Sequence, residues 1–296
     1  MSSKQNTQLT DVATYDVKNI VFSDPVSGEI PDSKPKIEFK RINISTLNPD
    51  GTEGELILPT ENLYSFGVCE NRSMETNKVN GYTFPICLWN KNGPTETETQ
   101  WTDKFNEIID TCIDHIVDVK DDIEMYELTR SDLTKSKGGI NPLYWKKERV
   151  KNEKTGKMEL QNVPGRGPTL YAKLMYSKAK NIFMSLFYDT EGNNLEPLNL
   201  IGQHCFFRGA VKIDSIFIGS KISIQVKIYE AEVEPVTNGP KRLLSRPKVV
   251  PKVVVESKQP EEKENETEIK DSDSESEEET PPPKKLIKKV VRKVKK

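Results

Sequence analysis

The sequence predicts a mainly β (α+β) fold, with short strands in an antiparallel barrel or sandwich, one long inserted helix and a charged C-terminal tail. Three observations lead to this prediction. Short runs that alternate between apolar and polar residues recur in both halves of the chain, separated by turns rich in Gly, Pro and Asn. Between them lies one segment with apolar residues at three- and four-residue spacing, which is typical of a helix. The last sixty residues are highly charged and poor in apolar residues, so they are predicted to be disordered.

The N-terminal part is predicted to contain five short strands after a polar, disordered segment over residues 1–14. The alternation in residues 36–44 slips after Phe39, which predicts a β-bulge. Pro85 interrupts the apolar segment YTFPICLW and cannot donate a ladder hydrogen bond, so this strand is predicted at an edge or a bulge. The five strands span residues 17–23, 36–44, 55–58, 63–69 and 82–89.

The clearest helix is predicted over residues 99–125, inside a helical insertion that extends from about residue 99 to 128. Thr99 or Thr102 is the expected N-cap. One face is apolar and is predicted to pack on the sheet, whereas the other is acidic and faces away from any phosphates. His115, beside the apolar face, is interpreted as a structural histidine. The apolar face comprises Trp101, Phe105, Ile108, Ile109, Cys112, Ile113, Ile116 and Val117; the acidic face comprises Asp103, Glu107, Asp110, Asp114, Asp118 and Asp121.

The C-terminal part is predicted to contain three pairs of strands. Residues 141–150 and 157–163 form a hairpin, and residues 169–177 pair with residues 182–189. A tight turn at Gly219-Ser220 joins the last pair. These strands favour an OB-fold barrel with elaborated loops over residues 15–236, with other antiparallel β folds as the alternative. The last pair spans residues 205–218 and 221–233, in which Ile222, Ile224, Val226 and Ile228 share one face and Lys221, Ser223, Gln225 and Lys227 the other.

Positive charge is concentrated between Arg130 and Lys180. This stretch holds thirteen Lys/Arg against four Asp/Glu, a net charge of +9, whereas residues 1–129 and 181–236 together carry −15. Aromatic residues are interleaved with the charge, and the Gly- and Pro-rich segment 163–168 presents Arg166 alone. Basic side chains neutralise phosphates and aromatic faces stack on unpaired bases, so the pattern indicates single-stranded nucleic-acid binding. The alternative is a solvated hairpin whose lysines keep the protein soluble.

Ten residues of this stretch form the candidate nucleic-acid-binding site. The cationic ones are expected to contact phosphates and the aromatic ones to stack on bases. Strand parity places Tyr171 and Lys173 on the face opposite their apolar neighbours, which favours an exposed Tyr171. Trp145 shares its parity with Leu143, so core packing stays an alternative for this ring. The candidates are Tyr144, Trp145, Lys146, Lys147, Arg149, Arg166, Tyr171, Lys173, Tyr176 and Lys178.

The tail, residues 237–296, carries three blocks of charge. Residues 241–252 carry +5, residues 256–280 carry −9 and residues 284–296 carry +8. The acidic block is predicted to compete with DNA for the basic face, and its serines suit an acidophilic kinase. The last block has the pattern of a basic amphipathic helix and of a nuclear import signal. A tail that only keeps the protein soluble is the alternative.

The sequence argues against catalysis and against a bound cofactor or metal. His115 and His204 are the two histidines, and neither lies in a catalytic motif such as HExxH. No two of the four cysteines have CxxC spacing, which makes a zinc site unexpected; apolar neighbours predict buried, reduced thiols in a reducing compartment. No apolar run suits a secretory signal or a membrane span, so no membrane association is expected.

The order of these features resembles a known family. Three local segments carry the likeness: YTFPICLW at residues 82–89, GGINPLYWKK at 138–147 and GRGPTLYAKLMY at 165–176. They resemble the single-stranded DNA-binding proteins of nucleocytoplasmic large DNA viruses, distant relatives of phage OB-fold replication proteins. The resemblance covers about residues 15–235 and implies a viral protein that coats unwound DNA without sequence preference. Phage-type tails end in an acidic block with a terminal aromatic, whereas this chain ends in a basic block.

We therefore expect a non-catalytic single-stranded DNA-binding protein that acts in viral DNA replication or repair, with RNA as an alternative ligand. Replication proteins are expected to bind the charged tail, and homo-oligomers are compatible with the sequence. The expected location is the viral factory in the host cytoplasm, the nucleus or the virion. The competing hypothesis is a structural or scaffolding protein, in the virion or on chromatin, whose basic tail alone contacts nucleic acid.

Overall fold

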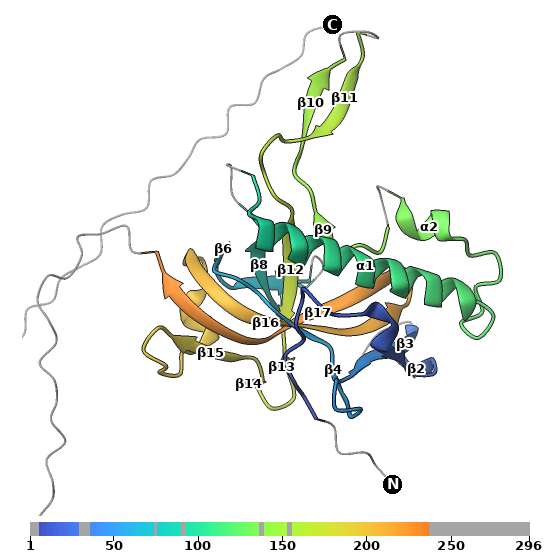
Figure 1. Cartoon of the computed structure of the whole chain (residues 1–296), viewed down its shortest axis with the longest axis horizontal. Coiled ribbons are helices and arrows are strands. Elements are labelled where there is room, and N and C mark those ends of the chain that lie inside the picture. Colours follow the sequence, from blue (N-terminus) through green and yellow to red (C-terminus); the bar gives the residue numbers. More distant parts are fainter. Residues whose placement is uncertain are drawn as a thin grey trace, which may run out of the picture. The chain divides into compact units, whose positions relative to one another are not determined.

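The computed structural model describes residues 6–29, 36–73, 76–89, 93–135, 139–152 and 156–236. These residues fall within Met1–Lys241, one of two units into which the chain divides. They form a set of strands with one long helix lying across them (Figure 1). The tail that the sequence predicts to be disordered, residues 237–296, lies outside the described residues.

Five strands close into a barrel. Along the chain they are β6 (Leu63–Ser65), β8 (Val79–Cys87), β12 (Thr169–Leu174), β16 (Cys205–Ile218) and β17 (Ile222–Pro235). The order around the barrel is β6-β8-β12-β17-β16, and β16 pairs with β6 to close it. The pairings are antiparallel except that of β12 with β17, which is parallel. This Greek-key order is that of an OB-fold barrel, so the predicted OB-fold-like barrel with an inserted helix is confirmed.

The barrel encloses an apolar core because its strands alternate between the two faces. Phe84 of β8 is fully buried and packs edge-on against Phe187 and Phe207, with ring centroids 5.6 Å and 5.1 Å away. Edge-to-face contacts are the geometry that aromatic quadrupoles favour. The predicted alternation of β17 is also confirmed, since Ile224, Val226 and Ile228 are buried.

The N-terminal strands extend the barrel along β16. The bulge predicted near Phe39 is wrong, because β3 pairs with its neighbours without a register shift. Ile42 and Ile44 face the core, whereas Phe39 packs on Phe217 on the other face of the sheet, 4.9 Å between ring centroids, which explains the slip in the pattern. The strands are β1 (Ile20–Phe22), β2 (Val26–Glu29), β3 (Glu38–Leu47), β4 (Glu53–Glu55) and β5 (Ile57–Pro59).

Two further N-terminal predictions differ from the structure. The first residues of the strand predicted over 17–23 form the 3-10 helix η1 (Val17–Asn19). Residues 6–14 belong to the segment predicted to be disordered, yet they lie along β4 and β5. The backbone N–H of Asn6 donates to Glu53 O at 3.0 Å and that of Thr10 to Ile57 O at 2.9 Å.

Of the two positions predicted for Pro85, an edge or a bulge, the edge is wrong, because β8 lies inside the barrel, whereas the ladder is irregular opposite Pro85. β12 pairs with one side of β8, and β6 and β7 (Cys69–Arg72) pair with the other. Pro85 lies opposite the gap between β6 and β7, where no strand residue pairs with it. The missing N–H of Pro85 therefore breaks no ladder hydrogen bond on that side. The Oγ of Ser65 donates to the carbonyl of Pro85 at 2.6 Å.

Helix α1 (Glu96–Asp118) begins earlier than predicted, because Thr95 caps it. The N–H of Glu98 donates to the Thr95 hydroxyl at 3.2 Å, and the Glu98 carboxylate accepts from the N–H of Thr95 at 2.7 Å. This is a capping box. Thr99 and Thr102, the predicted caps, lie inside the helix and donate to backbone carbonyls. The predicted apolar face is confirmed, and turns replace the helix after Asp118 until α2 (Arg130–Thr134).

The hairpin predicted from residues 141–150 and 157–163 is confirmed over β10 (Lys147–Lys151) and β11 (Met158–Asn162). The first part of the predicted strand is wrong, because it forms β9 (Leu143–Tyr144), which pairs with β12 instead. The predicted pairing of residues 169–177 with 182–189 is wrong for most of its length. β13 (Tyr176–Ser177) and β14 (Ile182–Phe183) do pair, but β15 (Leu186–Asp189) runs parallel to β17 because Phe187 is buried in the core there. A 3-10 helix, η2 (Pro197–Leu200), leads into β16.

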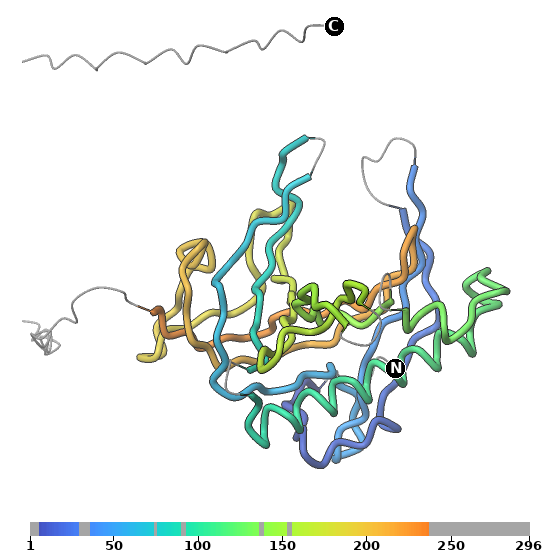
Figure 2. Tube along the Cα trace, turned by 90° about the horizontal axis from the view of Figure 1, so that it is seen from above, coloured from blue at the N-terminus to red at the C-terminus, as the bar shows by residue number. Residues whose placement is uncertain are grey.

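Figure 2 shows two hairpins, β2–β3 and β7–β8, on the side of the barrel away from α1. Within the described residues, no helix has the length and apolarity needed to cross a membrane. All four cysteines are free; Cys112 and Cys205 are buried, whereas Cys69 and Cys87 are half-buried. Burial raises the pKa of Cys112 to about 12 and that of Cys205 to about 11, so both thiols are protonated and unreactive at neutral pH.

Candidate nucleic-acid interface

Two tyrosines lie side by side on the outward face of the barrel. Tyr171 points out from β12 and is 49% exposed, as strand parity indicated. Short strand β9 pairs with β12 so that Tyr144 lies opposite Thr169. Tyr144 is 56% exposed, and its ring meets that of Tyr171 edge to face with centroids 6.2 Å apart. Tyr144 and Tyr171, the tyrosine pair, therefore present aromatic surface to solvent on a rigid sheet.

Lys173 continues the same face of β12. Its ammonium group donates to the Gln225 amide oxygen of β17 at 2.6 Å. Although Lys173 as a residue is exposed, its ammonium group is shielded against the sheet. This desolvation lowers the pKa of Lys173, and the nearby charges of Lys227 and Arg41 lower it further. The cation is thus held beside the tyrosine pair without an acidic partner among the described residues.

The Gly- and Pro-rich segment 163–168 packs against the barrel and leaves Arg166 exposed. A Cβ on Gly167 would lie 2.6 Å from the ring of Trp89, so only glycine allows this close approach. Trp89 also meets Trp145 edge to face, 5.5 Å between centroids, which leaves Trp145 half-buried. Arg166 is close enough to Cys87 to oppose the rise that burial causes in the pKa of that thiol. Arg166 therefore lies near Cys87, the last residue of β8.

The basic hairpin is exposed along both of its strands. Lys147 and Arg149 lie on one face of β10, and across the ladder they meet Asn162 and Leu160. Leu160 is 57% exposed and Met158 60% exposed, so this face combines cations with apolar side chains. Lys146 precedes the hairpin, and its carbonyl accepts the N–H of Val163 at 2.9 Å. Figure 1 shows the hairpin projecting away from the barrel.

The remaining two candidates lie at the other end of β12. Tyr176 packs edge-on against Tyr82, 5.1 Å between centroids, and lies tilted against Phe183 with centroids 4.9 Å apart. Its hydroxyl donates to the Asn181 amide oxygen at 2.6 Å. Lys178 is exposed and donates to the Asn80 amide oxygen at 3.4 Å. The candidates thus fall into three groups, which β12 connects: the tyrosine pair with Lys173 and Arg166, the basic hairpin with Trp145, and this aromatic cluster.

A hollow of about 780 Å³ lies between α1 and the base of the basic hairpin. Tyr144, Trp145 and Lys147 line one side of it, and Asn106 and Asp110 of α1 line the other. The hollow thus brings together candidates from two of the three groups.

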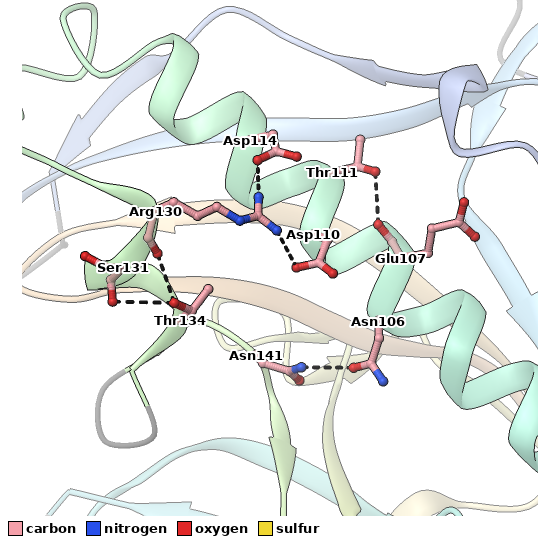
Figure 3. Close-up of polar contacts among 9 residues, drawn as sticks. All are labelled: Asn106, Glu107, Asp110, Thr111, Asp114, Arg130, Ser131, Thr134 and Asn141. Carbon is pink, nitrogen blue, oxygen red and sulfur yellow. Dashed lines mark hydrogen bonds and ion pairs between the residues drawn. The ribbon is translucent and has the colours of Figure 1, made fainter.

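The acidic face of α1 is partly neutralised by Arg130. Its guanidinium binds Asp110, with 2.9 Å between Nη2 and the carboxylate oxygen, and it also binds Asp114 (Figure 3). Asn141 donates to the Asn106 amide oxygen at 3.0 Å on the same helix. Arg130 therefore ties the segment after α1 back onto the helix, so this cation of the basic stretch has a structural role.

Sequence reasoning missed two groups on the outward face, because their members come from distant strands. Arg41 of β3 and Lys227 of β17 lie near Lys173. On another part of the barrel, Tyr64, His204 and Phe206 form edge-to-face pairs around Tyr64, with Phe66 beside them. The Tyr64 hydroxyl bonds to the His204 Nδ1 at 2.5 Å. The alternation of β17 marks Lys227 as outward-facing, but no pattern in the sequence places Arg41 beside it.

Comparison with known proteins relates this chain to a protein family and to a protein of an invertebrate virus. A family model described as "Protein of unknown function (DUF2738)" matches residues 13–278, which include the whole barrel. "Uncharacterized protein 007R" of Invertebrate iridescent virus 3 is 25% identical over 198 residues. The aligned part covers 64% of this chain but only 39% of that relative. The likeness to a virus protein supports the viral origin that the family resemblance implies.

Proposed function

The chain belongs to the DUF2738 family, and we propose that it is a non-catalytic protein that binds single-stranded DNA in viral DNA replication or repair. The tyrosine pair carries the proposal: two half-exposed rings stand beside Lys173 on an OB-fold-like barrel. OB-folds bind oligonucleotides across their second and third strands, which here are β8 and β12. Tyr171 lies opposite Pro85 in that pair of strands.

In this proposal, the tyrosine pair stacks on unpaired bases. A tyrosine ring stacks on any base, because every base has a π-face, so binding is independent of sequence. Duplex DNA does not offer its base faces, so the protein prefers single strands. Tyr144 and Tyr171 lie on paired strands of the barrel, which keeps their side chains in place before DNA binds.

The cations contact the phosphates. Lys173 lies beside the tyrosine pair, and Arg166 near the end of β8. Lys146, Lys147 and Arg149 extend this charge along the hairpin, whose exposed Leu160 offers apolar contact to bases. Trp145 and Tyr176 already pack against other rings, so in this proposal they support the interface from its edges. The protein releases counterions when it neutralises phosphates, so the affinity falls steeply with salt.

Binding of the full-length protein to fluorescein-labelled oligo-dT and to a duplex of equal length tests the proposal. Anisotropy titrations at two salt concentrations should give a strong preference for the single strand and a steep loss of affinity with salt. Quenching of tryptophan fluorescence on binding should be smaller in the Trp145→Ala variant. Equal and weak binding to both forms would refute the proposal and favour the scaffolding alternative. A matched oligo-U distinguishes RNA from DNA as the preferred ligand.

A further inference from the structure

Arg41 lies on the outward face of β3, and no ion pair or side-chain hydrogen bond satisfies it within the described residues. Its Nε is buried and has no hydrogen-bond partner. Buried nitrogen donors are nearly always paired in native proteins, so an unpaired one calls for an explanation. Arg41 pairs in register with Phe217 of β16, which pairs in turn with Ser223 of β17. Arg41 is thus fixed on the sheet that also carries Lys173.

Lys173 reaches the same part of the sheet from β12. β12 and β17 run parallel here, with Lys173 beside Lys227, and the Lys173 ammonium donates to Gln225. The Nε2 of Gln225 donates to the Ser223 hydroxyl at 2.8 Å. Lys173, Gln225 and Ser223 therefore form a polar chain across β17 toward β3 and Arg41. The electrostatic effect of Arg41 on the pKa of Lys173 agrees with this proximity.

The neighbouring cations are already compensated. Asp214 is the extra residue of a bulge in β16, and its carboxylate binds Lys227 at 2.7 Å and Lys212 at 3.1 Å. Glu55 also binds Lys212, at 2.5 Å. Arg41 and Lys173 are therefore left as two cations with no carboxylate partner among the described residues. Two like charges on a shielded surface are stabilised when an anion binds between them.

We infer that Arg41 and Lys173 form a binding subsite for one phosphate group, which in the proposed function is a backbone phosphate of the single strand. A guanidinium donates two parallel hydrogen bonds to a phosphate, and the neighbouring ammonium supplies a third donor. The inference rests on the proposed function for the identity of the ligand, but the anion site itself follows from the charges. It locates the principal phosphate contact on the sheet, between distant strands, and not in the basic hairpin.

Oligo-dT binding of the full-length protein and two variants tests the assignment. Arg41→Gln and Lys173→Gln should each lower the affinity at least about 10-fold. Each should reduce the slope of log affinity against log salt by about 0.7, the value for one phosphate contact on a single strand. Arg208→Gln is the matched control, because Arg208 is exposed and already paired with Glu232 at 3.1 Å. This control should change the affinity less than twofold, and Arg41→Lys, which keeps the charge, should lie between the control and Arg41→Gln.

A second measurement separates this inference from the proposed function. Inorganic phosphate, added at constant ionic strength in place of chloride, should raise the Tm of the wild type and of Arg208→Gln but not of Arg41→Gln. Phosphate protection without oligo-dT binding would support the anion site and refute DNA as its ligand. Oligo-dT binding that Arg41→Gln weakens no more than Arg208→Gln would overturn the inference and leave the proposed function intact. Absence of both effects in the wild type would overturn both.

Discussion

Replacing Tyr171 by alanine should weaken single-strand binding and leave the fold intact. Alanine substitution of a stacking aromatic costs about 1–3 kcal/mol per base, which corresponds to roughly 5- to 150-fold in Kd. Tyr171 is 49% exposed, and the Tyr144 ring meets the Tyr171 ring edge to face on one side. One ring face is therefore available to a base, so we expect the middle of this range, about 2 kcal/mol or roughly 30-fold.

Anisotropy titration with labelled oligo-dT at fixed salt measures this effect, and two variants serve as controls. Tyr126→Ala removes another exposed tyrosine, 65% exposed and located in the turns after α1, and should change Kd less than twofold. Tyr171→Phe keeps the ring and should also bind like the wild type. The reasoning is refuted if Tyr171→Ala and Tyr126→Ala bind equally well while both remain folded by circular dichroism.

A double-mutant cycle with Tyr144→Ala then tells whether the tyrosine pair holds one base or two. Separate bases give losses that add within about 0.5 kcal/mol, whereas a shared base gives a coupling energy beyond that limit. The 6.2 Å between the ring centroids and their edge-to-face angle of 72° favour contact with two bases. We therefore expect additive losses.

Three further predictions concern the scaffold. In urea unfolding, Gly167→Ala should lower the free energy of unfolding by about 1–3 kcal/mol, because the new Cβ would overlap Trp89. Gly81→Ala is the control and should have little effect, because the space around Gly81 is open. Arg130→Ala should cost at most about 1 kcal/mol in the same assay, since its ion pairs with Asp110 and Asp114 are exposed to solvent, and should change oligo-dT affinity less than twofold. Burial lowers the pKa of His115, whose ring stacks on Phe22 with centroids 4.0 Å apart, so the unfolded chain binds a proton more readily than the folded one. The free energy of unfolding should therefore fall as the pH drops below about 6.5, the ordinary pKa of histidine. This fall should be smaller in His115→Phe. Equal pH profiles of unfolding free energy for the two proteins would contradict the prediction.

Local patterns predicted much of the fold because they report burial directly. The apolar face of α1 and the alternation of β17 both follow from which side of each element meets the core. The spacing of Thr95 and Glu98 is that of a capping box and marks the true start of α1. Thr99 and Thr102 also suit an N-cap, so the sequence offered several possible starts. The choice among these threonines depends on where the preceding chain leaves the barrel, which local sequence does not encode.

Pairings between distant strands could not be predicted. The parallel contact of β12 with β17 joins residues more than fifty positions apart, and β16 then closes the barrel between β17 and β6. Strand parity correctly predicted that Tyr171 faces outward, but which side chains surround its ring depends on how β12 pairs with distant strands. Arg41 is the clearest case, because it comes from an N-terminal strand and yet lies close enough to Lys173 to lower its pKa. The basic stretch therefore identified part of the candidate site and missed the cation that the structure leaves unpaired.

The charges of β17 favour one direction for a bound strand. The outward residues of its first half are Ser223, Gln225 and Lys227. A register shift at Tyr229 then changes the phase, and Glu230, Glu232 and Glu234 are the exposed residues of the second half. Phosphates are repelled by these carboxylates and attracted by Arg41 and Lys173. A single strand that stacks on the tyrosine pair should therefore continue across the first half of β17 toward β3, and reversing Glu232 to lysine should relax this preference and raise the affinity for longer oligo-dT.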